Sequence, residues 1–127
     1  MPLALGSLTL VIAAAVAAVP APPPDSINAI IGDAGFVQAT GRAPTASDDP
    51  VRRVRLHLAR VEELLRARDT AGLSSSQRRQ RARLLEHLHR YWREGAFPHN
   101  QEVAGAVPTF VDGRGARCAV AFLVEQT

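Results

Sequence analysis

Two stretches of the chain carry apolar residues at the three- and four-residue spacing of an amphipathic helix. The first predicts a helix that begins at Pro50 and is followed by a connector ending at Gly72. Asp48 or Asp49 is expected to cap this helix, because a short acidic side chain accepts from the free N–H groups of a first turn, where proline is also favoured. The apolar stripe consists of Val51, Val54, Leu58, Val61 and Leu65.

A second helix is predicted from Ser74 to Glu94. Ser74 and Gln77 have the spacing of a capping box, and Gly95 followed by Pro98 is a stop signal. Two amphipathic helices joined by a short connector bury their stripes against each other, so we expect an antiparallel helical hairpin. The second stripe consists of Leu84, Leu85, Leu88, Tyr91, Trp92 and the aliphatic part of Arg81.

The pattern changes beyond the second helix. Residues 107–111 predict a short strand, and residues 112–115, Asp-Gly-Arg-Gly, predict a turn. The apolar run over residues 118–125 fits either a returning strand or a helix, and its alanines favour a helix that starts near Cys118. We therefore expect a mainly α domain with α+β character, in which residues 50–127 form an antiparallel helical hairpin packed on a short β-element.

An apolar run of residues 3–19 ends in small side chains and leads into a proline-rich spacer. Such a run is typical of a secretory signal peptide, so residues 1–21 are expected to be removed on export. No Lys or Arg precedes the run, and its length is at the lower limit for a membrane span, so an uncleaved anchor is the alternative. Residues 22–49 are expected to form an extended linker with a short helix or strand at residues 27–35.

The charge pattern adds a basic helical region. All 15 Lys+Arg residues are arginines, and residues 50–95 carry twelve of them against five acids, a net charge of +7, whereas the remaining residues carry −4. GC-rich codon usage explains such an excess without a function, as does a solvated face with the pairs Glu62–Arg66 and Glu86–Arg90. A functional basic surface on an exported protein would meet anionic envelope polymers or lipid headgroups rather than nucleic acid. The candidate anion-binding residues are Arg52, Arg53, Arg78 and Arg79.

Cys118 is the single cysteine of the chain, so it cannot form a disulfide within it. A thiol at the start of a helix is a candidate nucleophile, because free N–H groups there stabilise the thiolate. His99 is then the candidate base, and Asp112 or Asn100 is the residue that would orient it. The alternative is a buried thiol that acts as a small apolar side chain, and the apolar run after Cys118 favours this shielded state.

The histidines do not predict a metal or haem site. His87 and His89 lie two residues apart on the second predicted helix, about 200° around its axis, so they face nearly opposite sides. The chain also lacks the Cys-x-x-Cys and His-Glu-x-x-His motifs. No cofactor is expected, and the histidines are interpreted as surface or packing residues.

Three short motifs follow one another over the C-terminal half of the chain. Residues 97–100 read Phe-Pro-His-Asn, residues 108–112 read Pro-Thr-Phe-Val-Asp, and residues 115–120 read Gly-Ala-Arg-Cys-Ala-Val. Over roughly residues 60–127 this order resembles a family of uncharacterised exported bacterial proteins. The resemblance implies export and a shared architecture, but no activity and no catalytic residues. It also implies further helices, so we expect the natural chain to continue beyond Thr127.

These observations predict one small domain that is exported to the periplasm or secreted, because about 105 residues after the signal peptide suffice for a single core. The leading hypothesis is a non-enzymatic interaction module of the envelope or periplasm with an unknown ligand. The alternative is a cysteine-dependent enzyme that uses Cys118 with His99. An uncleaved signal peptide would instead anchor the domain to the membrane.

Overall fold

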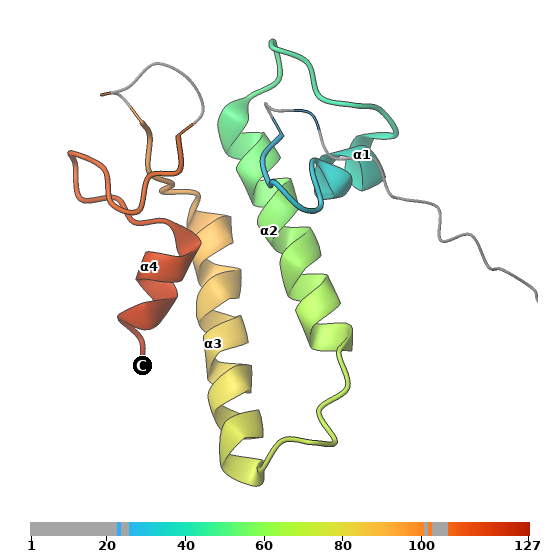
Figure 1. The fold of residues 1–127 in the computed structure, drawn as a ribbon, viewed down its shortest axis with the longest axis vertical. Coiled ribbons are helices and arrows are strands. Elements are labelled where there is room, and N and C mark those ends of the chain that lie inside the picture. Colours follow the sequence, from blue (N-terminus) through green and yellow to red (C-terminus); the bar gives the residue numbers. More distant parts are fainter. Residues whose placement is uncertain (1–22, 24–25, 101, 103–106) are drawn as a thin grey trace, which may run out of the picture.

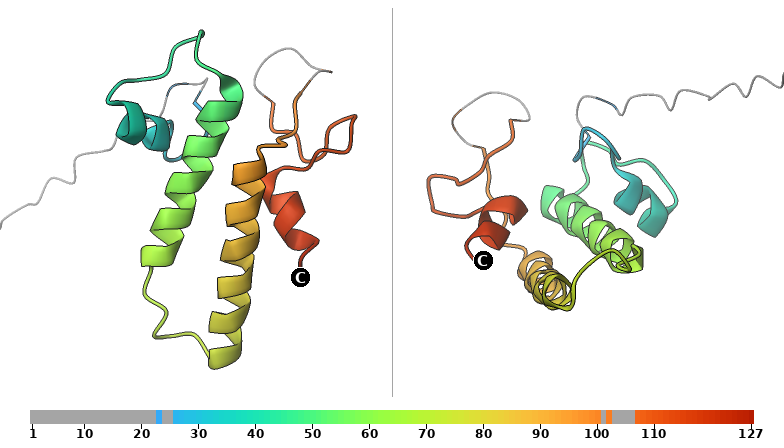
Figure 2. Two further views of the ribbon diagram at one scale, coloured as in Figure 1. Left: turned by 180° about the vertical axis from the view of Figure 1, so that it is seen from behind. Right: turned by 60° about the horizontal axis from the view of Figure 1, so that its bottom comes forward.

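The computed structural model describes residues 23, 26–100, 102 and 107–127, which are mainly helical. The long helices α2 and α3 lie side by side and run in opposite directions, with α1 against α2 and α4 against α3 (Figure 1, Figure 2). The predicted signal peptide lies outside the described residues. Within the described part of the chain, no helix has the length and apolar character needed to cross a membrane. The bounds are α1 Ala34–Thr40, α2 Pro50–Ala67, α3 Ser75–Glu94 and α4 Ala119–Val124.

The predicted starts of the two long helices and the predicted end of α3 are confirmed. The Asp49 side chain accepts from the N–H of Val51 at 3.0 Å, with proline at the first helical position. Ser74 and Gln77 form the reciprocal capping box at the start of α3. Gly95 ends α3 with a φ of 74°, a left-handed conformation that glycine adopts without a steric penalty. Local sequence signals therefore determine where both helices begin and where α3 ends.

The two predicted apolar stripes face each other and form the core. Leu58 of α2 packs with Leu85, Leu88 and Tyr91 of α3. Phe97, which follows α3, completes this cluster. Their burial from water is the main stabilising contribution to the helix pair. The partly buried residues around this core are Val51, Val54, Leu65, Trp92, Ala119, Phe122 and Leu123.

Helix α1 was not predicted. The sequence indicated a short element over residues 27–35, whereas the structure has turns there and a helix that begins at Ala34. Seven residues are too few for a helix that is stable by itself, so α1 depends on its packing against α2. Phe36 is 1% exposed, and a Cβ atom at Gly35 would overlap the carbonyl oxygen of Leu56. Close contact with α2 therefore stabilises α1, although its sequence lacks the periodic pattern of an amphipathic helix.

The predicted strand over residues 107–111 is wrong. Among the described residues the only β-type pairing is an isolated antiparallel bridge between Val111 and Arg117. The turn between them is present, because the N–H of Gly115 donates to the carbonyl of Asp112 at 2.9 Å. The helix predicted near Cys118 also forms, as α4. A returning strand has no room to extend, because the residues that would build it belong to α4.

Candidate functional site

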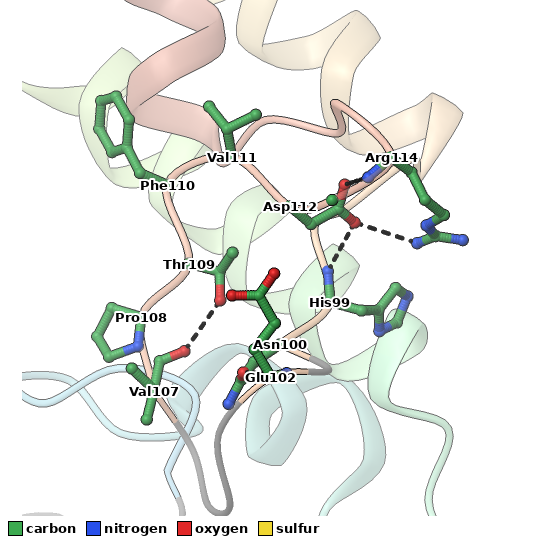
Figure 3. A pocket seen from close by; sticks show the side chains of 11 residues that line it. His99, Asn100, Glu102, Val107, Pro108, Thr109, Phe110, Val111, Asp112 and Arg114 are labelled. Atoms are coloured by element: carbon green, nitrogen blue, oxygen red, sulfur yellow. Dashed lines mark hydrogen bonds and ion pairs between the residues drawn. The ribbon is translucent and has the colours of Figure 1, made fainter.

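Asp112 organises the turn before α4 and does not act on an imidazole. Its carboxylate accepts from the backbone N–H groups of His99 at 3.1 Å and Arg114 at 2.9 Å (Figure 3), and also from that of Ala116 at 2.9 Å. The Arg114 guanidinium adds an ion pair at 3.2 Å, and the Asp112 side chain is only 3% exposed. These bonds, led by the one from His99, lower the pKa of Asp112 to about 2. The carboxylate is therefore committed to holding the loop.

His99 and Cys118 lie in the walls of different cavities. His99 is exposed and lines a cavity of about 500 Å³ together with Asp112 and Arg114, and its imidazole points away from the Asp112 carboxylate (Figure 3). Asn100, the other candidate for orienting a base, lines this cavity and also the one that contains Cys118. Within the described part of the chain, no hydrogen bond joins the His99 imidazole to either Asp112 or Cys118. The structure therefore does not assemble the predicted catalytic set.

Cys118 is held firmly at the start of α4. Its Sγ accepts from the N–H of Ala121 at 3.5 Å, and its own N–H donates to the carbonyl of Phe110 at 2.9 Å. The Tyr91 hydroxyl donates to the Arg117 carbonyl at 2.6 Å, beside Cys118. Burial, and in second place the nearby Cys118, raises the pKa of Tyr91 to about 12. The thiol is half-buried, so the expected shielding is partial.

Cys118 lines a cavity of about 370 Å³, which we call the thiol cavity. It lies where α2, the segment after α3 and the start of α4 meet. Val54 and Leu58 provide its wall on α2, and Phe97 and Ala119 provide apolar surface opposite. None of the described residues that line it carries an Asp, Glu, Lys or Arg side chain. The polar lining residues are His57, Tyr91, Asn100, Thr109 and Cys118.

His57 is the titratable side chain that shares the thiol cavity with Cys118 and Tyr91. It is 9% exposed, and its Nδ1 atom is buried without a hydrogen-bond partner among the described residues. Burial lowers the pKa of His57, and the negative charge of Asp33 offsets this only in part, so the folded environment favours the neutral imidazole. From the sequence, His57 is expected to be a surface or packing residue. Its position three residues after Val54, on the edge of the α2 stripe, was the available signal.

Two of the four candidate anion-binding arginines have partners inside the fold. The Arg53 guanidinium forms an ion pair with Asp33 at 2.9 Å, and both side chains are mostly buried. The Arg52 guanidinium lies over the ring of Phe36, 5.8 Å from its centroid, in a cation–π contact. Both residues therefore help to fix α1 and the turn before it on α2.

The other two candidates, Arg78 and Arg79, lie at the far end of the helix pair. Arg55 near the start of α2 donates to the Trp92 carbonyl near the end of α3, so the starts of the two helices are at opposite ends (Figure 1). Arg78 donates to the carbonyl of Leu73, and Arg79 is exposed. The four arginines therefore do not form one anion site, because two antiparallel helices place their first turns a helix length apart.

A buried carboxylate links α2 to α3 away from the thiol cavity. Glu62 is 6% exposed and accepts from Trp92 Nε1 at 2.6 Å, Arg66 Nε at 2.7 Å and His89 Nδ1 at 3.0 Å. Burial by itself raises the pKa of Glu62, but the bonds from Trp92, Arg66 and His89 outweigh it and lower the pKa. We call these four residues the Glu62 cluster. Among the described residues, no group of three or more potential ligands has the arrangement of a metal site.

The predicted Glu62–Arg66 pair is confirmed within this cluster. Glu86 instead pairs with Arg66 at 2.8 Å across the two helices, while Arg90 contacts the ring of His87 at 2.5 Å. The predicted Glu86–Arg90 pair is therefore replaced by these two contacts. A sequence pattern within one helix does not show the partner that a second helix offers.

Comparisons with known proteins provide no relative for this chain. No protein-family model matches it, and no curated protein and no solved structure is significantly similar to it. The resemblance proposed over residues 60–127 remains a prediction. The functional argument therefore depends on the geometry of the thiol cavity.

Proposed function

We propose that the protein is an exported, non-enzymatic interaction module of the periplasm or envelope that binds a small ligand in the thiol cavity. The observation that carries this proposal is the cavity itself, whose 370 Å³ fall at the lower end of the roughly 300–1,000 Å³ of ligand sites. Its walls are mainly apolar with a few polar groups, as in sites of that kind. The α2–α3 hairpin serves as the scaffold, and residues 97–98, 100, 107–110 and 118–119 complete the walls.

The arrangement of polar groups favours binding over catalysis. A nucleophilic thiol needs a base within hydrogen-bond reach and a third group that orients the base. Asp112 instead holds backbone N–H groups, and His99 lines the other cavity. The Arg117 guanidinium beside Cys118 is committed to Glu125 at 2.5 Å. The thiol therefore serves in this proposal as part of the wall.

Export is the first testable part of this proposal. We expect the mature chain to begin between Ala18 and Pro22, because small residues at the spacing required by signal peptidase cluster there. Intact-mass analysis of the protein from the envelope fraction of the producing cell measures this directly. An intact Met1 in that fraction would support the membrane-anchored alternative.

Ligand binding is the second part, and Cys118 reports on it because it is the only cysteine. We expect saturating acetophenone, a neutral aromatic probe of suitable size, to slow the reaction of Cys118 with an activated disulfide by about fivefold or more. Thr109→Trp should abolish this protection, because Thr109 lines the thiol cavity from a loop, where a larger side chain would reduce the space for the probe without replacing a residue of the helices.

The matched control is Val124→Trp, which places the same side chain at an exposed position of α4 outside the thiol cavity. It should retain the protection seen in the wild type. If acetophenone leaves the rate for Cys118 unchanged while circular dichroism shows a folded protein, the cavity is not a ligand site and the proposed function is wrong.

A further inference from the structure

The Nδ1 atom of His57 is buried and has no hydrogen-bond partner among the described residues. A buried polar atom without a partner costs about 1–3 kcal/mol, and most such atoms in folded proteins are satisfied. His57 also lines the thiol cavity, and because Nδ1 is enclosed, Nε2 is the ring nitrogen through which the imidazole can bind a ligand there. The state of Nδ1 therefore bears on what the imidazole can offer to that ligand.

The enclosure of Nδ1 determines what the imidazole can offer. A neutral imidazole carries its proton on one nitrogen only, and the other is an acceptor. Because Nδ1 is enclosed without an acceptor beside it, the proton is better placed on Nε2. The ring therefore offers an N–H donor to a ligand in the cavity.

The charge of the walls limits the ligand further. The described lining residues include no fully charged side chain, and the nearby Asp33 is already paired with Arg53. A charged group brought into such a cavity would lose its hydration without gaining a counter-ion. The walls therefore favour an uncharged group, and Phe97 and Leu58 favour an apolar body.

We infer that the ligand of the thiol cavity is a small uncharged molecule with an apolar body and one acceptor oxygen, a carbonyl, ether or hydroxyl, that accepts from His57 Nε2. This inference rests on the proposed function, since it assigns the ligand of the same cavity. It departs from the expectation of an anionic polymer or lipid headgroup, because the arginines lie elsewhere and the cavity carries no charge.

The test compares acetophenone with ethylbenzene, which has nearly the same shape but a methylene in place of the carbonyl. Dissociation constants are measured by ¹H–¹⁵N NMR titration of the mature chain. The two compounds also differ in hydration, so the quantity of interest is how the ratio of their dissociation constants changes between variants. We expect His57→Phe to weaken the relative binding of acetophenone by about fivefold, the loss of one neutral hydrogen bond.

Two further variants separate this role from a structural one. His57→Gln carries an amide N–H near the position of Nε2, so it should restore the ratio toward the wild-type value. His99→Phe changes an exposed imidazole outside the thiol cavity and should leave the ratio unchanged. An unchanged ratio in His57→Phe, or an equal change in His99→Phe, overturns the inference. If both compounds bind and protect Cys118 with that result, the proposed function stands, whereas failure of both to bind overturns the two together.

Discussion

Glu62→Gln is expected to lower the free energy of unfolding by about 2–3 kcal/mol at pH 7. The carboxylate accepts from Trp92, Arg66 and His89 together, and an amide has one acceptor oxygen and an NH₂ group that faces donors. The loss is below that of a fully buried ion pair because the Arg66 and His89 side chains are 43% and 39% exposed. Urea denaturation followed by circular dichroism measures it.

The next residue on α2 gives a matched control. Glu63 forms an ion pair with Arg60 at 2.8 Å, but its side chain is 61% exposed. Exposed pairs contribute little, so Glu63→Gln should change the free energy of unfolding by no more than about 0.5 kcal/mol. Equal effects of the two substitutions would show that the Glu62 cluster does not link the helices.

The same cluster predicts how the difference between the variants depends on pH. The pKa of Glu62 is lowered in the folded protein, so its carboxylate stabilises the fold above its ordinary value of 4.5. That contribution is lost as the pH falls through the folded-state pKa, because the protonated acid then resembles glutamine. The difference in free energy of unfolding between wild type and Glu62→Gln should therefore shrink below pH 4.5. A difference that stays constant down to acid unfolding would contradict the stabilising role of the ionised Glu62 carboxylate.

The features that could be predicted from the sequence are those set by residues close together in the chain. The capping box of Ser74 and Gln77 and the proline at the start of α2 act within one helical turn. The apolar stripes also required only the helical period, and both reach the core. α1 could not be found in this way, because Phe36 is buried by contacts with α2 and not by a repeat within seven residues.

The candidate site was harder to predict because it joins distant segments. His99 is closer than His57 to Cys118 in sequence, yet the thiol cavity joins His57 on α2 to Cys118, sixty-one positions further along the chain. Asp112 was expected to orient a base, but its carboxylate instead accepts from the backbone N–H groups of His99, Arg114 and Ala116. Asp112 therefore holds backbone groups of two segments, the one after α3 and its own turn, a role that only the tertiary arrangement shows.

The arginine-rich composition also has a structural explanation. Arg55 donates to carbonyls at the end of α3, Arg53 and Arg66 form ion pairs between elements, and Arg81 donates to the Leu65 carbonyl across the helix pair. A guanidinium with several donors suits such links better than an ammonium group does. Much of the positive charge in the described structure thus joins α1, α2 and α3, which reduces the number of arginines that remain to bind an anionic partner.

Leu88→Ala is expected to lower the free energy of unfolding by about 2–4 kcal/mol, through lost burial and the void that remains. Leu88 is 3% exposed and lies in the core with Leu58 and Tyr91, so neighbouring side chains cannot easily fill the space. In a small domain the loss is a large share of the whole stability. Urea denaturation with an unchanged m-value measures it, since the surface exposed on unfolding stays the same.

Leu58→Ala removes the opposite wall of the same core and should cost a similar amount. Because the two voids merge, we expect the two substitutions to be non-additive. The loss in free energy of unfolding of the double variant should differ from the sum of the single losses by at least about 0.5 kcal/mol. Leu64→Ala is the matched control on α2, since that side chain is 43% exposed and its loss should cost less than about 1 kcal/mol. Strict additivity of Leu58→Ala and Leu88→Ala, or a Leu88→Ala protein that unfolds at the wild-type urea concentration, would show that these two stripes do not share one core. The walls of the thiol cavity would then lose their support as well, because Leu58 belongs to both.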